Sequence, residues 1–201
     1  MVLVSHDHYD HLDEKSLQEI DATYRPIFIA GLNSEDSFPK GSVLIEMDWT
    51  EKRLIEIKGQ TFEVTFVPAC HWSKRKLWER NTRLWGGFIV KTPRGQQLFY
   101  SGDTAYCEIF KEIGDLFGPF DLAILPIGAY EPNWMMFAAH TTPEEAVKIH
   151  LDLRSKKSVA VHWGTFPLGF EHWHQPKKDL AKAKLKYGLR DEEFITVVHG
   201  S

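Results

Sequence analysis

The feature that most constrains this chain is a dense run of ionisable side chains directly after its first apolar segment. Val2–Val4 is expected to form a short strand, and His6, His8, Asp10 and His11 follow it with the spacing H-x-H-x-D-H. Histidines held this close repel one another when they are charged, and that repulsion brings no structural benefit. The run therefore favours a fold in which this turn surrounds a shared binding centre.

Strand-like and helix-like segments alternate along the chain, a pattern typical of α/β proteins. Thr142 is the predicted N-cap of one helix, Glu145 is its capping-box partner, and Gly188 is the predicted end of another. Helices are expected over Glu14–Asp21, Cys107–Phe117, Pro143–Leu153 and Lys177–Tyr187. Strands are expected over Val2–Val4, Pro26–Ala30, Thr61–Val67, Gly86–Lys91, Gln97–Ser101, Leu122–Ile127, Ser158–His162 and Phe194–Val198.

Further polar side chains lie where predicted strands stop. His71, Asp103 and His162 each follow or end a separate strand. Because strand ends meet along one edge of an α/β sheet, such residues converge although they are far apart in sequence. A single histidine after a strand is more often an ordinary solvated residue, so this prediction depends on the whole set. We expect these three side chains to lie beside the H-x-H-x-D-H turn.

The chemistry of this set predicts a metal centre. Neutral imidazole and carboxylate groups together suit Zn²⁺, and Fe or Mn also accept them. Asp103 follows Gly102, which allows a tight turn, and its carboxylate can bridge two cations. We therefore expect two divalent metal ions. The predicted ligands are His6, His8, His71 and Asp103 for one ion, and Asp10, His11, His162 and Asp103 for the other.

Composition limits the partners and the compartment. The 201 residues carry a net charge of −4, so a nucleic-acid partner, which requires a basic surface, is not expected. No stretch reaches the roughly 20 apolar residues that span a bilayer. The two cysteines, Cys70 and Cys107, cannot form the disulfide framework of a small secreted domain. A reducing, cytoplasmic compartment is therefore expected, with peripheral membrane contact as an open alternative.

The order of the candidate ligands resembles the signature of the metallo-β-lactamase superfamily. A narrower resemblance, to N-acylphosphatidylethanolamine-hydrolysing phospholipase D and its bacterial relatives, covers most of the chain through eight motifs. They are His6–Asp13 (HDHYDHLD), Pro68–Trp72 (PACHW), Leu84–Gly86 (LWG), Ser101–Cys107 (SGDTAYC), Phe117–Asp121 (FGPFD), Pro126–Pro132 (PIGAYEP), Pro143–Val147 (PEEAV) and His162–Phe166 (HWGTF).

This resemblance implies an αββα sandwich. The superfamily's first metal motif normally follows several strands, whereas here it begins at residue 6. Residues 1–201 are therefore expected to form a single metallo-β-lactamase-like domain that is the C-terminal portion of the full fold and lacks much of the N-terminal β-sheet. Exposed sheet edges would then favour association into a homo-oligomer.

The resemblance also implies a reaction. Two cations would activate water near neutral pH for hydrolysis of an N-acylated ethanolamine phospholipid to phosphatidic acid and an N-acylethanolamine. The same fold could instead act on a lactone or another small anionic phosphoester, or bind metal without turnover.

Residues outside the ligand set carry further expectations. We expect Asp10 and His140 to take part in catalysis, and the resemblance implies that His140 and Tyr9 contact the substrate. Lys74–Lys76 could steer an anionic headgroup or simply form a solvated face. Trp134–Phe137 could form a lid or a lipid-contacting edge, or be buried beneath the next helix.

Overall fold

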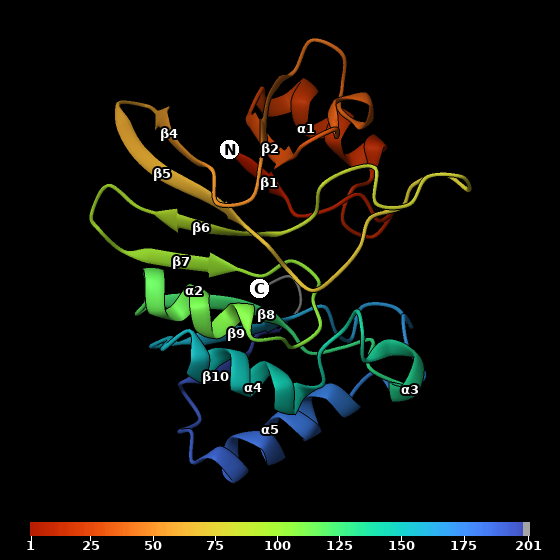
Figure 1. The fold of residues 1–201 in the computed structure, drawn as a ribbon, viewed down its shortest axis with the longest axis vertical. Helices are drawn as coiled ribbons and strands as arrows, with labels where there is room; N and C mark the ends of the chain where they lie inside the picture. Colours follow the sequence, from red (N-terminus) through yellow and green to blue (C-terminus); the bar gives the residue numbers. More distant parts are fainter. Residues whose placement is uncertain (199–201) are drawn as a thin grey trace.

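A computed structural model describes residues 1–198 and arranges their strands in two sheets (Figure 1). The smaller sheet is parallel and contains β1 (Val2–Val4), β2 (Ile27–Gly31) and β3 (Val43–Met47), in that order. Ile29 and Met47 of this sheet are fully buried. Strand β1 leads directly into the H-x-H-x-D-H turn, so its carboxyl end positions the first predicted ligands.

The larger sheet has seven strands in the order β10-β9-β8-β7-β6-β5-β4. Its strands β4 to β7 pair antiparallel, whereas β7 to β10 pair parallel. The bounds are β4 (Lys52–Ile57), β5 (Gln60–Val67), β6 (Gly87–Lys91), β7 (Gln97–Tyr100), β8 (Leu122–Pro126), β9 (Ser158–Val161) and β10 (Phe194–Thr196).

Helices cover the outer faces of both sheets (Figure 1). Their bounds are α1 (Glu14–Tyr24), α2 (Ile109–Phe117), α3 (Asn133–Met136), α4 (Pro143–Asp152) and α5 (Gln175–Tyr187), with a 3₁₀ turn at Glu35–Ser37. The predicted capping box at α4 is confirmed, because the Thr142 hydroxyl accepts from Glu145 N–H while the Glu145 carboxylate accepts from Thr142 N–H. Gly188 ends α5 at φ 72°, as predicted.

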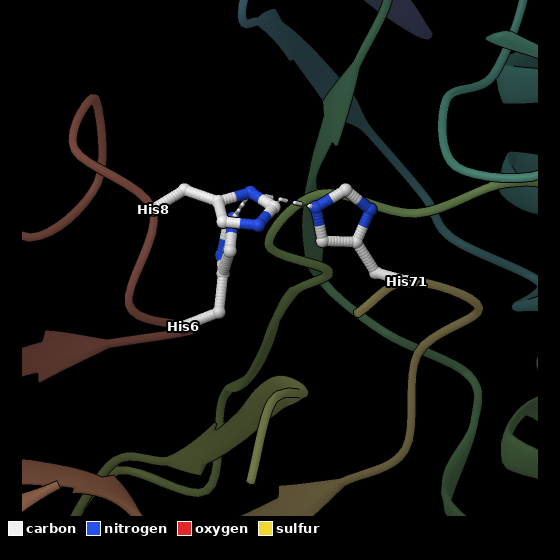
Figure 2. A group of neighbouring side chains, drawn as sticks. All are labelled: His6, His8 and His71. Carbon is white, nitrogen blue, oxygen red and sulfur yellow. Dashed lines mark hydrogen bonds between the residues drawn. The ribbon is translucent and has the colours of Figure 1, made fainter. Parts of the chain in front are cut away.

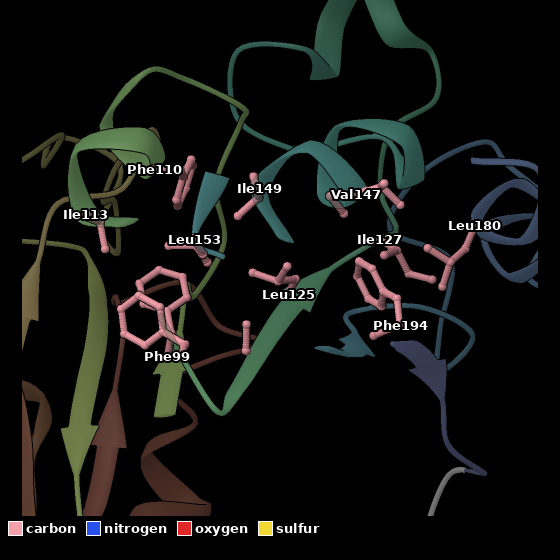
Figure 3. Packing of buried hydrophobic residues seen from close by; sticks show 14 of the residues in the cluster. Phe99, Phe110, Ile113, Leu125, Ile127, Val147, Ile149, Leu153, Leu180 and Phe194 are labelled. Atoms are coloured by element: carbon pink, nitrogen blue, oxygen red, sulfur yellow. The ribbon is translucent and has the colours of Figure 1, made fainter. Parts of the chain in front are cut away.

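Three apolar clusters hold these layers together. Ile29 and Met47 of the smaller sheet pack with Phe66 and Phe88 of the larger sheet. A second cluster joins α1 to the outer face of the smaller sheet. The third cluster lies between the larger sheet and α2, α4 and α5, and includes the fully buried Phe99 (Figure 3). The layer order is therefore helix, sheet, sheet, helix, which confirms the predicted αββα sandwich.

Some elements differ from the sequence predictions. Strands β3 and β4 were not predicted, and β4 is an edge strand whose charged residues and exposed Leu54 lack a clear strand pattern. The short helix α3 occupies a predicted loop, and its Trp134 is 76% exposed, so burial of this segment beneath α4 is wrong. Residues 199–201 of the predicted single domain lie outside the described part of the chain.

The two cysteines are joined, which the sequence analysis did not predict. Cys70 and Cys107 form a disulfide with their Cα atoms 6.6 Å apart. Both flank predicted ligands, because Cys70 precedes His71 and Cys107 lies four residues after Asp103. The expected cytoplasmic compartment stays a prediction. None of the helices within residues 1–198 combines the length and the apolar character needed to cross a bilayer.

Candidate metal centre

Three of the predicted ligands form one group, the imidazole group, defined as His6, His8 and His71. The first two lie on the loop after β1, the third lies after β5, and their rings face one another (Figure 2). His6 Nε2 is 3.0 Å from His8 Nδ1, and His71 Nε2 is 3.2 Å from the same atom. Three ring nitrogens from two distant segments thus converge on one point.

The other four predicted ligands form a second group, the acidic group, defined as Asp10, His11, Asp103 and His162. His162 Nε2 lies 3.2 Å from Asp103 Oδ2 and 3.3 Å from Asp10 Oδ2. His11 Nε2 lies 3.2 Å from Asp103 Oδ1. Asp103 Oδ2 is also 4.0 Å from His71 Nε2 of the imidazole group. The structure therefore brings all seven predicted side chains together and puts Asp103 between the two groups.

Backbone conformation explains how the strand ends meet. Gly102 has φ +62°, and a Cβ atom there would lie 2.6 Å from Ser5 Cβ. Only glycine therefore lets the Asp103 turn approach the segment that carries His6. His162 also has a positive φ, 57°, at the end of β9. This unusual conformation turns the chain where the His162 side chain joins the acidic group.

Neighbouring groups orient the imidazole group. The backbone carbonyl of Ala139 lies 2.8 Å from His71 Nδ1, and a carbonyl can only accept a hydrogen bond. His71 therefore carries its proton on Nδ1 and directs the Nε2 lone pair toward the other imidazoles. Ser5 Oγ contacts His6 Nδ1 at 3.0 Å, so the opposite nitrogen of that ring also faces the group. Such outer contacts are typical of metal-binding histidines.

The two groups differ in their electrostatics. Burial lowers the pKa of every histidine in the imidazole group, and that of His71 falls to about 3. Burial also opposes charge in the acidic group, but contacts with Asp10 and Asp103 outweigh it. They raise the pKa of His11 to about 9 and that of His162 to about 10. The imidazole group is therefore neutral at pH 7, whereas the acidic group pairs carboxylates with charged imidazoles.

The donor set fits divalent cations. His8 Nε2 is buried without a hydrogen-bond partner among residues 1–198, and the 3.2 Å contact between His11 Nε2 and Asp103 Oδ1 lacks the geometry of a hydrogen bond. Unsatisfied buried polar atoms are costly unless a ligand or ion engages them. The ligand atoms within each group also lie within 4.8 Å of one another. Nitrogen and carboxylate oxygen donors at this spacing suit Zn²⁺, Fe or Mn.

A buried ion pair that the sequence analysis missed fixes the turn that carries the ligands. Asp7 is 2% exposed, and its carboxylate accepts from Lys74 N–H at 2.9 Å and from Arg83 Nη1 at 3.2 Å. Arg75 Nη1 donates to the carbonyls of Asp7 and Leu12. These contacts join the first metal motif to the predicted loop 73–83. An H-x-H-x-D-H pattern gives no signal for them, because their partners lie more than 60 residues away.

The predicted substrate residues lie beside the metal centre in different ways. His140 Nδ1 is 3.8 Å from Asp103 Oδ2, and its ring stacks on His162. Tyr9 is 69% exposed, donates to the Arg75 carbonyl and packs its ring against the Arg75 guanidinium. Arg75 is thus engaged by the metal motif rather than presented to an anionic headgroup. Substrate contact by His140 and Tyr9 stays a prediction.

Comparisons with known proteins agree with this arrangement. A family model described as a beta-lactamase superfamily domain matches residues 1–163. The N-acyl-phosphatidylethanolamine-hydrolyzing phospholipase D 1 of Caenorhabditis elegans is 35% identical over 213 residues, covering 98% of this chain and 58% of the relative. The mitochondrial enzyme of the same name from Saccharomyces cerevisiae is 34% identical, covering 95% of this chain and 42% of the relative. The chain therefore spans about half the length of these curated relatives.

Solved structures share the fold at lower identity. Igni18, a metallo hydrolase from Ignicoccus hospitalis, superimposes with a TM-score of 0.70 at 22% identity, covering 100% of this chain and 76% of that structure. An isothiocyanate hydrolase from Delia radicum gut bacteria gives a TM-score of 0.67 at 15% identity, covering 100% of this chain and 74% of that structure. With its two facing sheets and its ligand-bearing strand ends, the chain belongs to the beta-lactamase superfamily and has the metallo-β-lactamase fold.

Proposed function

We propose that this chain is a two-metal hydrolase that cleaves a phosphodiester. The observation that carries the proposal is the convergence of seven donor side chains into two adjacent groups, with Asp103 of the acidic group 4.0 Å from His71 of the imidazole group. Zn²⁺ is the proposed ion at both positions, since imidazole and carboxylate donors suit it, and Fe or Mn is the alternative. When bound, the two ions would lower the pKa of water and neutralise charge that develops on the phosphoryl oxygens.

The groups of the protein itself would position the reactants. The acidic group holds the carboxylates of Asp10 and Asp103 ionised, so both can bind cations at neutral pH. The Ala139 carbonyl and Ser5 hold imidazole rings in the orientation that points lone pairs inward. Preorganisation of this kind avoids reorganising the site during the reaction.

His140 is the proposed hydrogen-bond donor to the phosphate. Burial lowers the pKa of His140, which keeps the ring neutral at pH 7, and Nδ1 has no hydrogen-bond partner among the described residues. A neutral imidazole that donates one hydrogen bond stabilises a phosphoryl oxygen without competing for the cations. This role agrees better with the surroundings of His140 than proton donation to the leaving alkoxide, which requires the charged ring.

The proposed substrate is an N-acylphosphatidylethanolamine, cut on the headgroup side to give phosphatidic acid and an N-acylethanolamine. Two relatives at 34–35% identity bear the name of this activity, and they support the substrate class. Such a substrate lies in a bilayer, and Trp134 on α3 and Phe137 directly after it are exposed apolar side chains that can contact one. Peripheral membrane contact is therefore part of the proposal.

A vesicle assay tests the proposal. Zinc-loaded protein is incubated with vesicles that contain N-acylphosphatidylethanolamine, and both products are quantified by mass spectrometry. We expect equal amounts of N-acylethanolamine and phosphatidic acid, and a loss of about 100-fold or more in kcat for His140→Gln. The exposed His172 serves as the control, since His172→Gln should retain full activity.

Other outcomes would identify other functions. Hydrolysis of a lactone or of another phosphoester in place of the phospholipid would overturn the substrate assignment. It would still support the assignment of the chain as a two-metal hydrolase. Full metal content without turnover of any of these substrates would contradict the enzymatic proposal. The chain would then be a metal-binding protein that lacks hydrolytic activity.

A further inference from the structure

A cavity of about 670 Å³ opens beside the acidic group. Asp10, His11 and His162 form one end of it, so whatever occupies the cavity touches the candidate metal centre. The segment after β9 forms most of the remaining wall. The large apolar side chains of the wall are Trp163, Phe166, Pro167, Leu168, Trp173 and Pro176. We call this cavity the apolar pocket.

The part of the apolar pocket beyond the metal centre disfavours an anionic occupant. No lysine or arginine lines the pocket, and its carboxylates are Asp10 and Glu171. Glu171 bonds to the protein, because Oε1 accepts from Ala129 N–H at 2.5 Å and Oε2 accepts from Glu131 N–H at 3.1 Å. Beyond the metal centre, a wall with a carboxylate and without lysine or arginine favours a neutral apolar occupant over an anion.

A second cavity also borders Asp10. It measures about 410 Å³, and Lys74, Arg75 and Lys76 are among its lining residues together with His8 and Tyr9. Asp10 lines both cavities, so both border the candidate metal centre. A phosphodiester held there has two arms, and only one of them can occupy the apolar pocket.

Size decides which arm enters the apolar pocket. At roughly 30 Å³ for each heavy atom, the share that a water molecule takes in the liquid, the pocket holds about 20 heavy atoms. A single long acyl chain on ethanolamine has roughly this size, whereas a diacylglycerol with two such chains has about twice as many heavy atoms. The leaving group therefore fits the pocket and the diacylglycerol arm does not.

We propose that the apolar pocket binds the acyl chain of the leaving N-acylethanolamine and thereby selects substrates by the length of that chain. This inference rests on the proposed function, since it assigns one arm of the proposed substrate. Phe166 is 55% exposed and Trp173 is 57% exposed, so a bound chain would cover apolar surface that faces water without it. That coverage is the source of the affinity.

Direct binding tests the pocket independently of catalysis. Saturated N-acylethanolamines with about eight, ten and twelve acyl carbons are titrated into the zinc-loaded chain, and Kd is measured by calorimetry. Burial of each methylene should tighten binding about fourfold, so the three probes should span roughly 200-fold. Phe166→Glu places a carboxylate in the pocket wall. This variant should bind the longest N-acylethanolamine tenfold or more weakly, and its Kd should depend less on chain length.

Phe170 supplies a matched control. It lies on the same segment, is 85% exposed and is not among the residues that line the pocket. Phe170→Glu introduces the same charge and should leave the length dependence unchanged. Equal effects of the two variants, or a Kd independent of chain length in the unaltered chain, would overturn the inference. Hydrolysis of bis(4-nitrophenyl) phosphate by the unaltered chain tests the proposed function separately, because this probe has no acyl chain.

Discussion

The Cys70–Cys107 disulfide allows a quantitative prediction about stability. The bond joins residues 37 apart in sequence, and it connects the loop that carries His71 to the segment after Asp103. The loop-closure relation for a disulfide gives a stabilisation of about 4 kcal/mol at this separation. For a domain of this length, that energy corresponds to a fall in Tm of about 10 °C when the bond is removed.

The same region retains other links when the bond is absent. Ala105 N–H donates to the Cys70 carbonyl at 2.8 Å, and Cys70 N–H donates to Thr104 Oγ1 at 3.0 Å. These hydrogen bonds hold the two ligand-bearing segments together in the folded state. We therefore expect removal of the disulfide to lower stability while the folded protein keeps its full metal content.

The assay compares the unaltered chain with the variant in which Cys70 and Cys107 are both serine. Unfolding in urea is followed by circular dichroism, with and without a phosphine reductant, and metal content is measured on the folded fraction. The reductant should destabilise the unaltered chain by about the same amount as the double substitution and should not affect the variant. A difference in unfolding free energy below about 1 kcal/mol, or a loss of metal from the folded variant, would refute this reasoning.

Four further predictions concern the metal centre. In urea unfolding, Gly102→Ala should destabilise the protein by about 1–3 kcal/mol more than Gly59→Ala. Both glycines have positive φ, but only a Cβ at position 102 would contact another residue. Equal destabilisation by the two variants would contradict the steric explanation. Arg83→Met should cost about 3–5 kcal/mol because it leaves the buried Asp7 carboxylate without its partner, and unchanged thermal stability would exclude that role. At pH 7, cation binding to the acidic group should release about two protons, which calorimetry in buffers of different ionisation enthalpy measures. In chelated protein, the charged forms of His11 and His162 stabilise the fold because their pKa values are higher in the folded than in the unfolded state. This stabilisation is complete below pH 6.5 and should disappear as the pH rises through about 9–10. A constant Tm across that range would contradict this prediction.

The sequence predicted the convergence of the candidate ligands because their positions follow from chain geometry. His71, Asp103 and His162 follow β5, β7 and β9, which run in the same direction, so their carboxyl ends lie at one edge of the sheet. The alternation of strands and helices predicted an α/β fold, and the resemblance alone implied the αββα sandwich. The capping residues of α4 were predictable because a Thr-Pro-x-Glu pattern acts within one turn.

The groups that orient the ligands could not be predicted in the same way. The Ala139 carbonyl that fixes the His71 proton is a backbone group, which every residue possesses. The Asp7–Arg83 pair and the disulfide depend on how the loops after β1, β5 and β7 stack, and local patterns carry no information about that stacking. Strand β4 was missed because an exposed edge strand needs little apolar alternation.

Metal stoichiometry of the purified protein, measured by elemental analysis after loading with Zn²⁺ and removal of free ions, tests the central claim most directly. The account predicts two equivalents of metal for each chain, falling toward one or none in His8→Ala, with no change in the exposed His172→Ala variant. Protein that retains no metal after loading, or His8→Ala protein with the same metal content as the unaltered chain, would contradict it.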